Sequence, residues 1–248
     1  MPFPLAHPAA VLPLRRWCPK ILHFPSLVIG SITPDLATSI DDWEYFSHTI
    51  PGTFLFCLPV GILTLWIFYQ LRIPLVSTFP NRHRDALLPL CNGIPNPFGS
   101  MVASLLIGSW LHVVWDLFTH EHSWLVQHFA FFSWRIATLP LNAVLWLLSS
   151  FGGIWVLLKA YGSVLKRTKP AVQTFWQRDR HAYAFWSLIL IIPLAGAVPW
   201  ALQGFTPGDS PITVVRALFM YYLGCAYIIL TLVGLALRHR IRRIKESG

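Results

Sequence analysis

Histidine and aspartate occur at helical spacing within one apolar segment of the chain. His112 and Asp116 are four residues apart in the run Gly108–His120, so a helix places both side chains on one face. A neutral imidazole and an ionised carboxylate on one face can together bind a divalent cation. The pair by itself is also explained by a buried hydrogen bond between helices, so its spacing alone leaves both interpretations open.

Two further histidines and one aspartate stand at the ends of neighbouring apolar segments. His7 begins the first segment, Asp35 closes the second, and His48 begins the third. Ionisable groups within or beside membrane spans are expensive and usually mark function. If the segments alternate across a membrane, these groups gather on the same side as His112 and Asp116. This convergence favours a metal site over an isolated polar pair.

The segments that must position these side chains are long and apolar. Of the 248 residues, 55% are hydrophobic and only 12% are charged, and the mean hydropathy is +0.56. A soluble domain carries about 25% charged residues, so the composition excludes a soluble globular protein, a disordered chain and a coiled coil. A helix needs roughly 20 apolar residues to cross a bilayer. The segments that satisfy this requirement are Thr49–Leu71, Phe98–Thr119, Leu141–Tyr161, Tyr183–Gln203 and Thr213–Leu237.

A more interrupted apolar region precedes these five spans. We expect two shorter membrane-embedded helices there, His7–Trp17 and Ile21–Leu36, separated by the basic turn Arg15–Lys20. Neither is long enough for a comfortable crossing, which favours a packed or re-entrant hairpin. Ile73–Pro97 is rich in proline and arginine without a helical period, so we expect an irregular loop. The expected fold class is all-α, a polytopic membrane helix bundle.

The basic residues fall in alternate connections. The formal net charge is +9, with 19 Lys and Arg against 10 Asp and Glu. With strict alternation, the basic groups after the first, third and fifth long spans lie on one side, which the positive-inside rule makes cytoplasmic. This explains the charge without a nucleic-acid partner. The residues concerned are Arg72, Arg82, Arg84, Lys159, Lys166, Arg167, Lys169, Arg178, Arg180, Arg238, Arg240, Arg242, Arg243 and Lys245.

We therefore expect a single integral domain in the inner or plasma membrane, with cytoplasmic basic loops and C-terminus. Residues 1–122 hold the candidate site, which faces the outer side. Residues 123–140 form an interfacial loop rich in Trp and Phe. Residues 141–248 supply three further spans and the basic tail, either as a shield from lipid or as a dimer interface. The oligomeric state stays open.

The first half of the chain contains, in order, the motifs Met1–His7, Gly30–Asp35, Ser47–Thr49 and Gly108–His120. Their order resembles that in a family of uncharacterised bacterial integral-membrane proteins. A related family comprises membrane-bound proteins described as metal-dependent hydrolases. A more distant similarity is to the zinc-dependent phospholipase C and single-strand nuclease fold, whose helical enzymes hold three zinc ions.

The distant similarity implies a set of metal ligands. One ion is expected between two aspartates and two histidines, and a second ion is expected to share Asp116 with His7. The late HxxxE motif of those enzymes is absent from this sequence, which leaves their third zinc site unmatched. Zinc is the implied metal, although His and carboxylate ligands also suit manganese or iron. The implied ligands are His7, Asp35, His48, His112, Asp116 and His122.

These expectations describe a membrane-embedded metal-dependent hydrolase that acts on a membrane lipid or a lipid-linked phosphoester. Bound metal lowers the pKa of water and polarises a phosphoryl oxygen, so Asp35 and Asp116 are the expected catalytic carboxylates. The general base stays open between metal-bound hydroxide and a carboxylate such as Asp41, Asp42 or Glu44. The sequence identifies no substrate-binding residue.

Two alternatives remain at the level of sequence. One is a non-catalytic membrane protein with a structural metal or a polar helix cap. The other is a cation transporter. The position of the ligands argues against a transporter, because they gather at one end of the spans rather than at the midplane.

Overall fold

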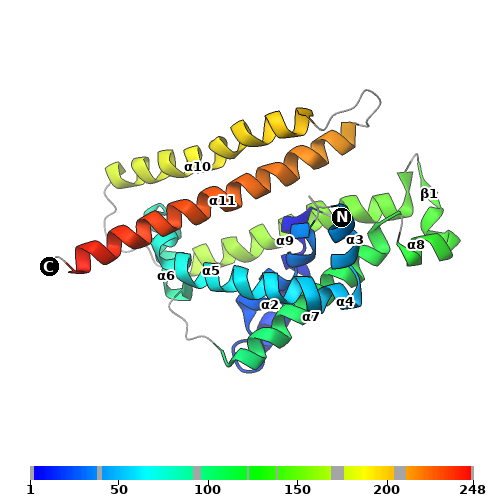
Figure 1. Cartoon of the computed structure of the whole chain (residues 1–248), viewed down its shortest axis with the longest axis horizontal. Helices are drawn as coiled ribbons and strands as arrows, with labels where there is room; N and C mark the ends of the chain where they lie inside the picture. Colours follow the sequence, from blue (N-terminus) through cyan, green and yellow to red (C-terminus); the bar gives the residue numbers. More distant parts are fainter. Residues whose placement is uncertain are drawn as a thin grey trace. The chain divides into compact units, whose positions relative to one another are not determined.

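The fold is almost entirely helical (Figure 1). The computed structural model describes residues 3–37, 41–91, 96–121, 123–137, 139–168, 176–203 and 211–246. Within these residues, five helices are long and apolar enough to cross a membrane, which confirms the expected all-α bundle of five spans. They are Ile50–Val76, Phe98–His128, Leu141–Arg167, Arg180–Pro199 and Ala217–Arg243.

The N-terminal region consists of short helical pieces, as expected, but the second piece is divided. Helix α2 (Phe24–Gly30) begins with Pro25 in its first turn and ends before the 3-10 turn η3 (Thr33–Ala37). Pro34 explains the break, since its ring lacks an N–H and would clash with the carbonyl of Gly30 in a continuous helix. The first piece comprises η1 (Pro4–Ala6), α1 (Pro8–Val11) and η2 (Leu12–Trp17).

The first long span is built from several consecutive pieces. Helix α3 (Asp41–Ser47) is followed by α4 (Ile50–Gly52), where the Thr49 hydroxyl accepts a hydrogen bond from the Gly52 N–H and so caps the helix. A π-helical turn, η4 (Thr53–Cys57), leads into α5 (Leu58–Val76).

The expectation of an irregular loop over Ile73–Pro97 is wrong. Helix α5 continues through Pro74 to Val76, and α6 forms over Asn81–Cys91. The buried positions of α6 include the polar Asn81 beside Ala86 and Cys91, so its buried face shows no clear apolar period in the sequence.

Helix α7 (Phe98–Thr119) packs closely on α2. A Cβ atom on Gly30 would meet the Leu105 carbonyl, and one on Gly108 would meet the Leu27 carbonyl. Glycine at these two positions therefore permits the helices to touch through their backbones. The Ser109 hydroxyl also donates to the Gly30 carbonyl at 3.1 Å. This contact fixes the end of α2 against the polar half of α7.

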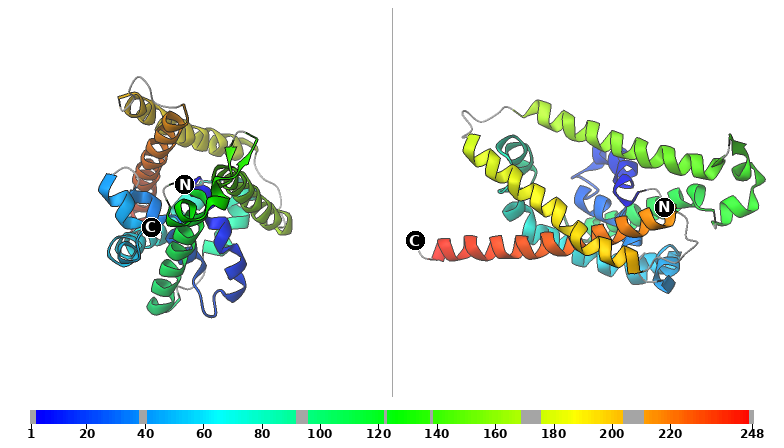
Figure 2. Two further views of the ribbon diagram at one scale, coloured as in Figure 1. Left: turned by 90° about the vertical axis from the view of Figure 1, so that its right-hand side faces the viewer. Right: turned by 90° about the horizontal axis from the view of Figure 1, so that it is seen from above.

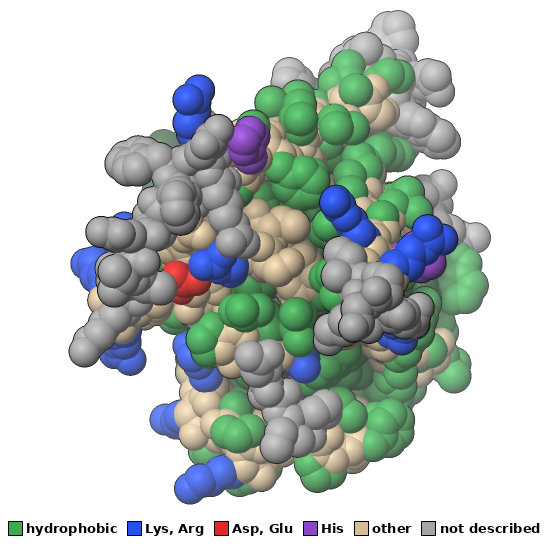
Figure 3. Space-filling view, turned by 90° about the vertical axis from the view of Figure 1, so that its left-hand side faces the viewer, with side chains coloured by type: hydrophobic (Ala, Val, Ile, Leu, Met, Phe, Trp, Pro, Cys, Tyr) green, Lys and Arg blue, Asp and Glu red, His purple; other side chains and the backbone are tan. Residues whose placement is uncertain are grey.

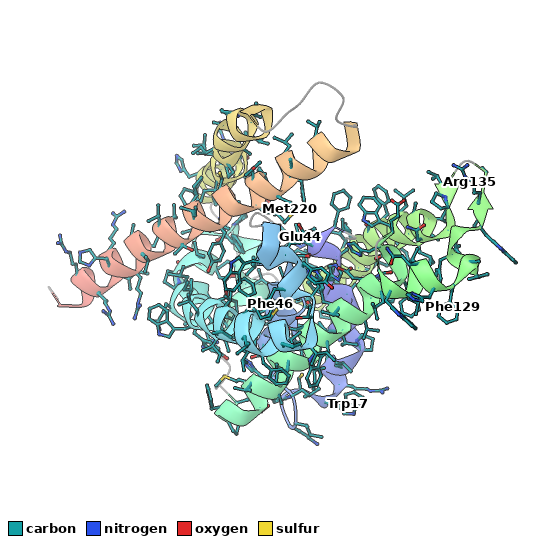
Figure 4. All side chains as sticks on the ribbon, turned by 45° about the vertical axis from the view of Figure 1, so that its right-hand side comes forward. Trp17, Glu44, Phe46, Phe129, Arg135 and Met220 are labelled. Atoms are coloured by element: carbon teal, nitrogen blue, oxygen red, sulfur yellow. The ribbon has the colours of Figure 1, made fainter. Side chains whose placement is uncertain are left out.

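An aromatic segment joins α7 to α9 (Leu141–Arg167). It contains α8 (Trp124–His128), η5 (Ala130–Ser133) and a hairpin of β1 (Arg135–Ile136) with β2 (Leu139–Pro140). Figure 4 labels Phe129 and Arg135 in this segment, at the end of the unit where α7 finishes and α9 starts. The exposed aromatic side chains here include Trp124, Phe129, Phe131 and Trp134.

The chain divides into two compact units, residues 1–65 with 94–163 and residues 66–93 with 164–248. The second unit contains the antiparallel pair α10 (Trp176–Gln203) and α11 (Pro211–Glu246), which lie side by side (Figures 1 and 2). Arg240, Arg242 and Arg243 are exposed near the end of α11. Figure 3 shows Lys and Arg side chains that lie beside hydrophobic ones.

Candidate metal centre

Five of the residues that we selected from the sequence meet inside the first unit. His7 lies between η1 and α1, Asp35 in η3, His48 after α3, and His112 with Asp116 in α7. Four of these residues are almost fully buried, and the His48 side chain is 21% exposed. Segments more than 100 positions apart in sequence therefore contribute to one polar cluster within an apolar bundle.

Four ligand atoms of this cluster lie at the spacing that a single ion requires. His112 Nε2 is 3.3 Å from Asp35 Oδ1 and 3.3 Å from Asp116 Oδ2. His48 Nε2 is 3.4 Å from Asp116 Oδ2, 3.8 Å from Asp35 Oδ1 and 3.3 Å from His112 Nε2. A tetrahedral ion with bonds of about 2.0–2.1 Å separates its ligands by about 3.3 Å. The four side chains are thus placed to hold a metal ion.

Backbone carbonyls fix the orientation of both imidazoles. His112 Nδ1 donates to the Ser31 carbonyl and His48 Nδ1 donates to the Glu44 carbonyl, each at 2.8 Å. A carbonyl oxygen can only accept, so each proton sits on Nδ1 and each neutral ring presents a lone pair at Nε2. Two lone pairs that face each other cannot hydrogen-bond, whereas both can bind a cation. Such carbonyl partners are the usual supports of metal-binding histidines.

His7 faces the opposite oxygens of the same two carboxylates. Its Nε2 lies 3.9 Å from Asp35 Oδ2 and 3.7 Å from Asp116 Oδ1. The His7 ring stacks on that of His112 with centroids 3.8 Å apart. Burial lowers the pKa of His7 to about 3. His7 is therefore neutral at physiological pH, the form in which an imidazole binds a metal.

Five buried polar atoms of this cluster have no hydrogen-bond partner among the described residues. They are His7 Nε2 and all four carboxylate oxygens of Asp35 and Asp116. Buried polar atoms are nearly always hydrogen-bonded, and an unpaired buried charge is costly. All five converge on one small volume, and all are metal ligands by type. Bound cations are the simplest way to satisfy them together.

The structure adds one histidine that the sequence reasoning did not select. His120 Nδ1 lies 3.1 Å from the Asp116 carbonyl and 3.6 Å from Asp116 Oδ1. The signal was present, because His112, Asp116 and His120 follow one another at intervals of four on one helical face. We selected His122 as the further histidine, and it lies outside the described residues.

The candidate general bases are only partly covered by the structure. The side chains of Asp41 and Asp42 lie outside the described part of the chain. Glu44, labelled on α3 in Figure 4, contributes its backbone carbonyl to the orientation of His48. The choice of a general base stays a prediction.

Comparison with known proteins identifies the family. A family model described as "Domain of unknown function (DUF4184)" matches residues 1–237, so the chain belongs to this family. No curated protein and no solved structure shows significant similarity to the chain.

Proposed function

We propose that this protein is a membrane-embedded hydrolase that uses two divalent cations, with zinc as the first candidate metal. One observation carries the proposal. Asp35 and Asp116 each turn one oxygen toward the His48–His112 pair and the other toward His7, and all four oxygens lack a hydrogen-bond partner among the described residues. Carboxylates that divide their oxygens in this way are suited to bridge two ions.

The two sets of side chains differ in the number of ligands that each offers to an ion. The set of Asp35, His48, His112 and Asp116 provides four protein ligands, which closes a tetrahedral site. The set of His7 with the second oxygens of Asp35 and Asp116 provides three ligands among the described residues. Three ligands leave a position for water or substrate, as in catalytic rather than structural zinc sites. This difference supports catalysis over a purely structural metal.

Paired divalent cations supply an activated water and stabilise both the attacking and the leaving oxygen of a phosphoester. The protein's own residues do the remaining work. Asp35 and Asp116 hold the negative charge that attracts the cations into an apolar interior. The Ser31 and Glu44 carbonyls keep the His112 and His48 rings in one tautomer.

The cluster is open to solvent only where His48 and His120 lie, among the described residues. The side chains of His48 and His120 are 21% and 30% exposed, whereas those of His7, Asp35 and His112 are sealed. A substrate therefore reaches the centre over His48 and His120. His120, in contact with Asp116, is placed to move a proton at this exposed edge.

The proposed substrate is a phosphoester of a membrane lipid or a lipid-linked molecule, at the outer face of the cell membrane. The ligands cluster near the end of α7 that precedes the aromatic segment, while the basic connections belong to the opposite ends of the spans. By the positive-inside rule, the centre lies at the outer headgroup level. The comparisons add no support for a relation to known hydrolases, so the proposal rests on the geometry of the ligands and on their place along the spans.

The test is hydrolysis of bis(p-nitrophenyl) phosphate by detergent-purified protein supplied with Zn²⁺ or Mn²⁺. We expect metal-dependent turnover that falls by at least about 10³-fold in Asp116→Asn, because both ligand sets lose an oxygen charge. Asp85→Asn is the matched control, since Asp85 is paired with Arg84 outside this cluster. Turnover that survives in Asp116→Asn would exclude this centre as the source of activity.

A further inference from the structure

We propose that a cavity beside the metal centre binds the hydrocarbon chain of an amphiphilic substrate and so directs its phosphoester to the two ions. This inference rests on the proposed hydrolase function and specifies the substrate class. The cavity has a volume of about 300 Å³, at the lower end of the range for small-molecule sites. It lies entirely within the first unit, between the N-terminal residues, α7 and α9.

The cavity shares a wall with the metal centre. His7 lines it, and His7 Nε2 is a buried atom without a hydrogen-bond partner among the described residues. The remaining wall is formed by small or apolar side chains, including Ala9, Trp115 and Val156. Any molecule in the cavity therefore has one end against His7, whose ring separates the cavity from the two carboxylates.

The chemistry of the wall selects an apolar occupant. Apart from His7, the polar side chain in the wall is Ser149, whose hydroxyl donates to the Trp146 carbonyl of its own helix at 3.1 Å. Apart from these two side chains and the indole N–H of Trp115, the side chains that line the cavity carry no polar atom. A molecule that fits has an apolar body and a polar group at the His7 end, which describes an alkyl or isoprenyl phosphoester.

The position of the cavity along the spans agrees with this occupant. Trp115 lies about 6 Å from the end of α7, at 1.5 Å per residue. Gly152 lies about 16 Å from the start of α9, the helix that follows α7 and the aromatic segment. The cavity therefore runs from the level of the metal ligands toward the middle of a hydrocarbon layer about 30 Å thick. A lipid chain occupies this depth naturally.

The occupant that we propose for this cavity of about 300 Å³ is a single lipid chain rather than a protein helix. A single chain of methylenes fits the same space. We therefore assign the cavity to a lipid chain.

Gly152→Leu is the variant that adds apolar bulk at the cavity wall without a clash. Gly152 lines the cavity, and a Cβ there meets nothing within 4 Å. Gly153 is unsuitable, since its Cβ would lie 2.9 Å from the Cβ of Ala6. Gly162→Leu is the matched control, because Gly162 is on the same helix, has equal space and does not line the cavity.

The first readout compares dodecyl with methyl p-nitrophenyl phosphate as substrates of the metal-loaded protein. Each methylene excluded from an apolar site costs about fourfold in affinity, so exclusion of two by leucine costs at least about tenfold. We expect the ratio of kcat/KM for dodecyl over methyl to fall by that factor in Gly152→Leu and to stay constant in Gly162→Leu. An unchanged ratio in Gly152→Leu, or an equal fall in both variants, overturns the inference.

The second readout measures chain binding without turnover. A dodecyl phosphate with a diazirine at the chain terminus is crosslinked to Asp116→Asn protein and the labelled peptides are identified by mass spectrometry. We expect labelling near the N-terminus and around Gly152, with at least about tenfold loss when Gly152→Leu is added. Labelling together with absent hydrolysis in the wild type removes the proposed function and leaves the cavity assignment standing. Hydrolysis with no labelling of these peptides overturns the cavity assignment alone.

Discussion

Metal should stabilise the folded protein strongly, and Asp116 should be necessary for that effect. The carboxylate of Asp116 offers Oδ2 to the His48–His112 pair and Oδ1 to His7, at 3.3–3.7 Å. A ligand that binds only the folded state stabilises it by RT ln(1 + [L]/Kd), which is about 2.7 kcal/mol at 100 times Kd. For a chain of this length, 1 kcal/mol moves Tm by roughly 2–4 °C. Saturating Zn²⁺ should therefore raise Tm by roughly 5–11 °C.

The assay is thermal unfolding in detergent, followed by tryptophan fluorescence, with EDTA-treated protein before and after added Zn²⁺. Asp116→Asn should lose most of the shift, since an amide offers no negative charge to either ligand set. Asp85→Asn should keep the full shift, because Asp85 pairs with Arg84 and contacts none of the ligands. A full shift in Asp116→Asn would refute the reasoning, and so would a wild-type protein whose Tm is the same with EDTA and with Zn²⁺.

Two further perturbations test the fold and the orientation. Gly30→Ala should lower Tm by roughly 2–12 °C, because the added Cβ meets the Leu105 carbonyl and overpacking costs about 1–3 kcal/mol. Gly99→Ala, where a Cβ meets nothing within 4 Å, should leave Tm unchanged, and equal effects would contradict the close packing of α2 on α7. In a chain whose four native cysteines are replaced by serine, Ile136→Cys should react with an impermeant maleimide added to intact cells. Arg167→Cys should not react, and the reverse pattern would overturn the outer location of the centre.

The sequence predicted which five residues gather in the cluster, because helical spacing and the alternation of the spans can both be followed along the chain. Their role as metal ligands stays a prediction. His112 and Asp116 share a helical face by their interval of four. Alternation of the spans then brings the ends that carry His7, Asp35 and His48 to the same side. The structure gathers all five in one buried cluster.

Residue spacing could not predict that Asp35 and Asp116 each turn one oxygen toward the His48–His112 pair and the other toward His7. This arrangement depends on the break between α2 and η3, which places Asp35 between His7 and His112. The cavity could not be predicted from the sequence either, because its wall combines Ala9 with Gly152, more than 140 positions apart. Helix α6 was missed for a different reason, because its buried face is partly polar.

The central claim is that two ions share Asp35 and Asp116, and metal content tests it most directly. Elemental mass spectrometry of purified protein should find about two zinc, manganese or iron ions per chain. His7→Ala should retain about one ion, because His7 belongs only to the second ligand set, whereas Asp116→Asn should retain neither. His23→Ala removes a buried histidine that bonds Ser26 outside the centre, and should retain both. A folded wild-type protein that binds no ion after each metal is added back would contradict the account.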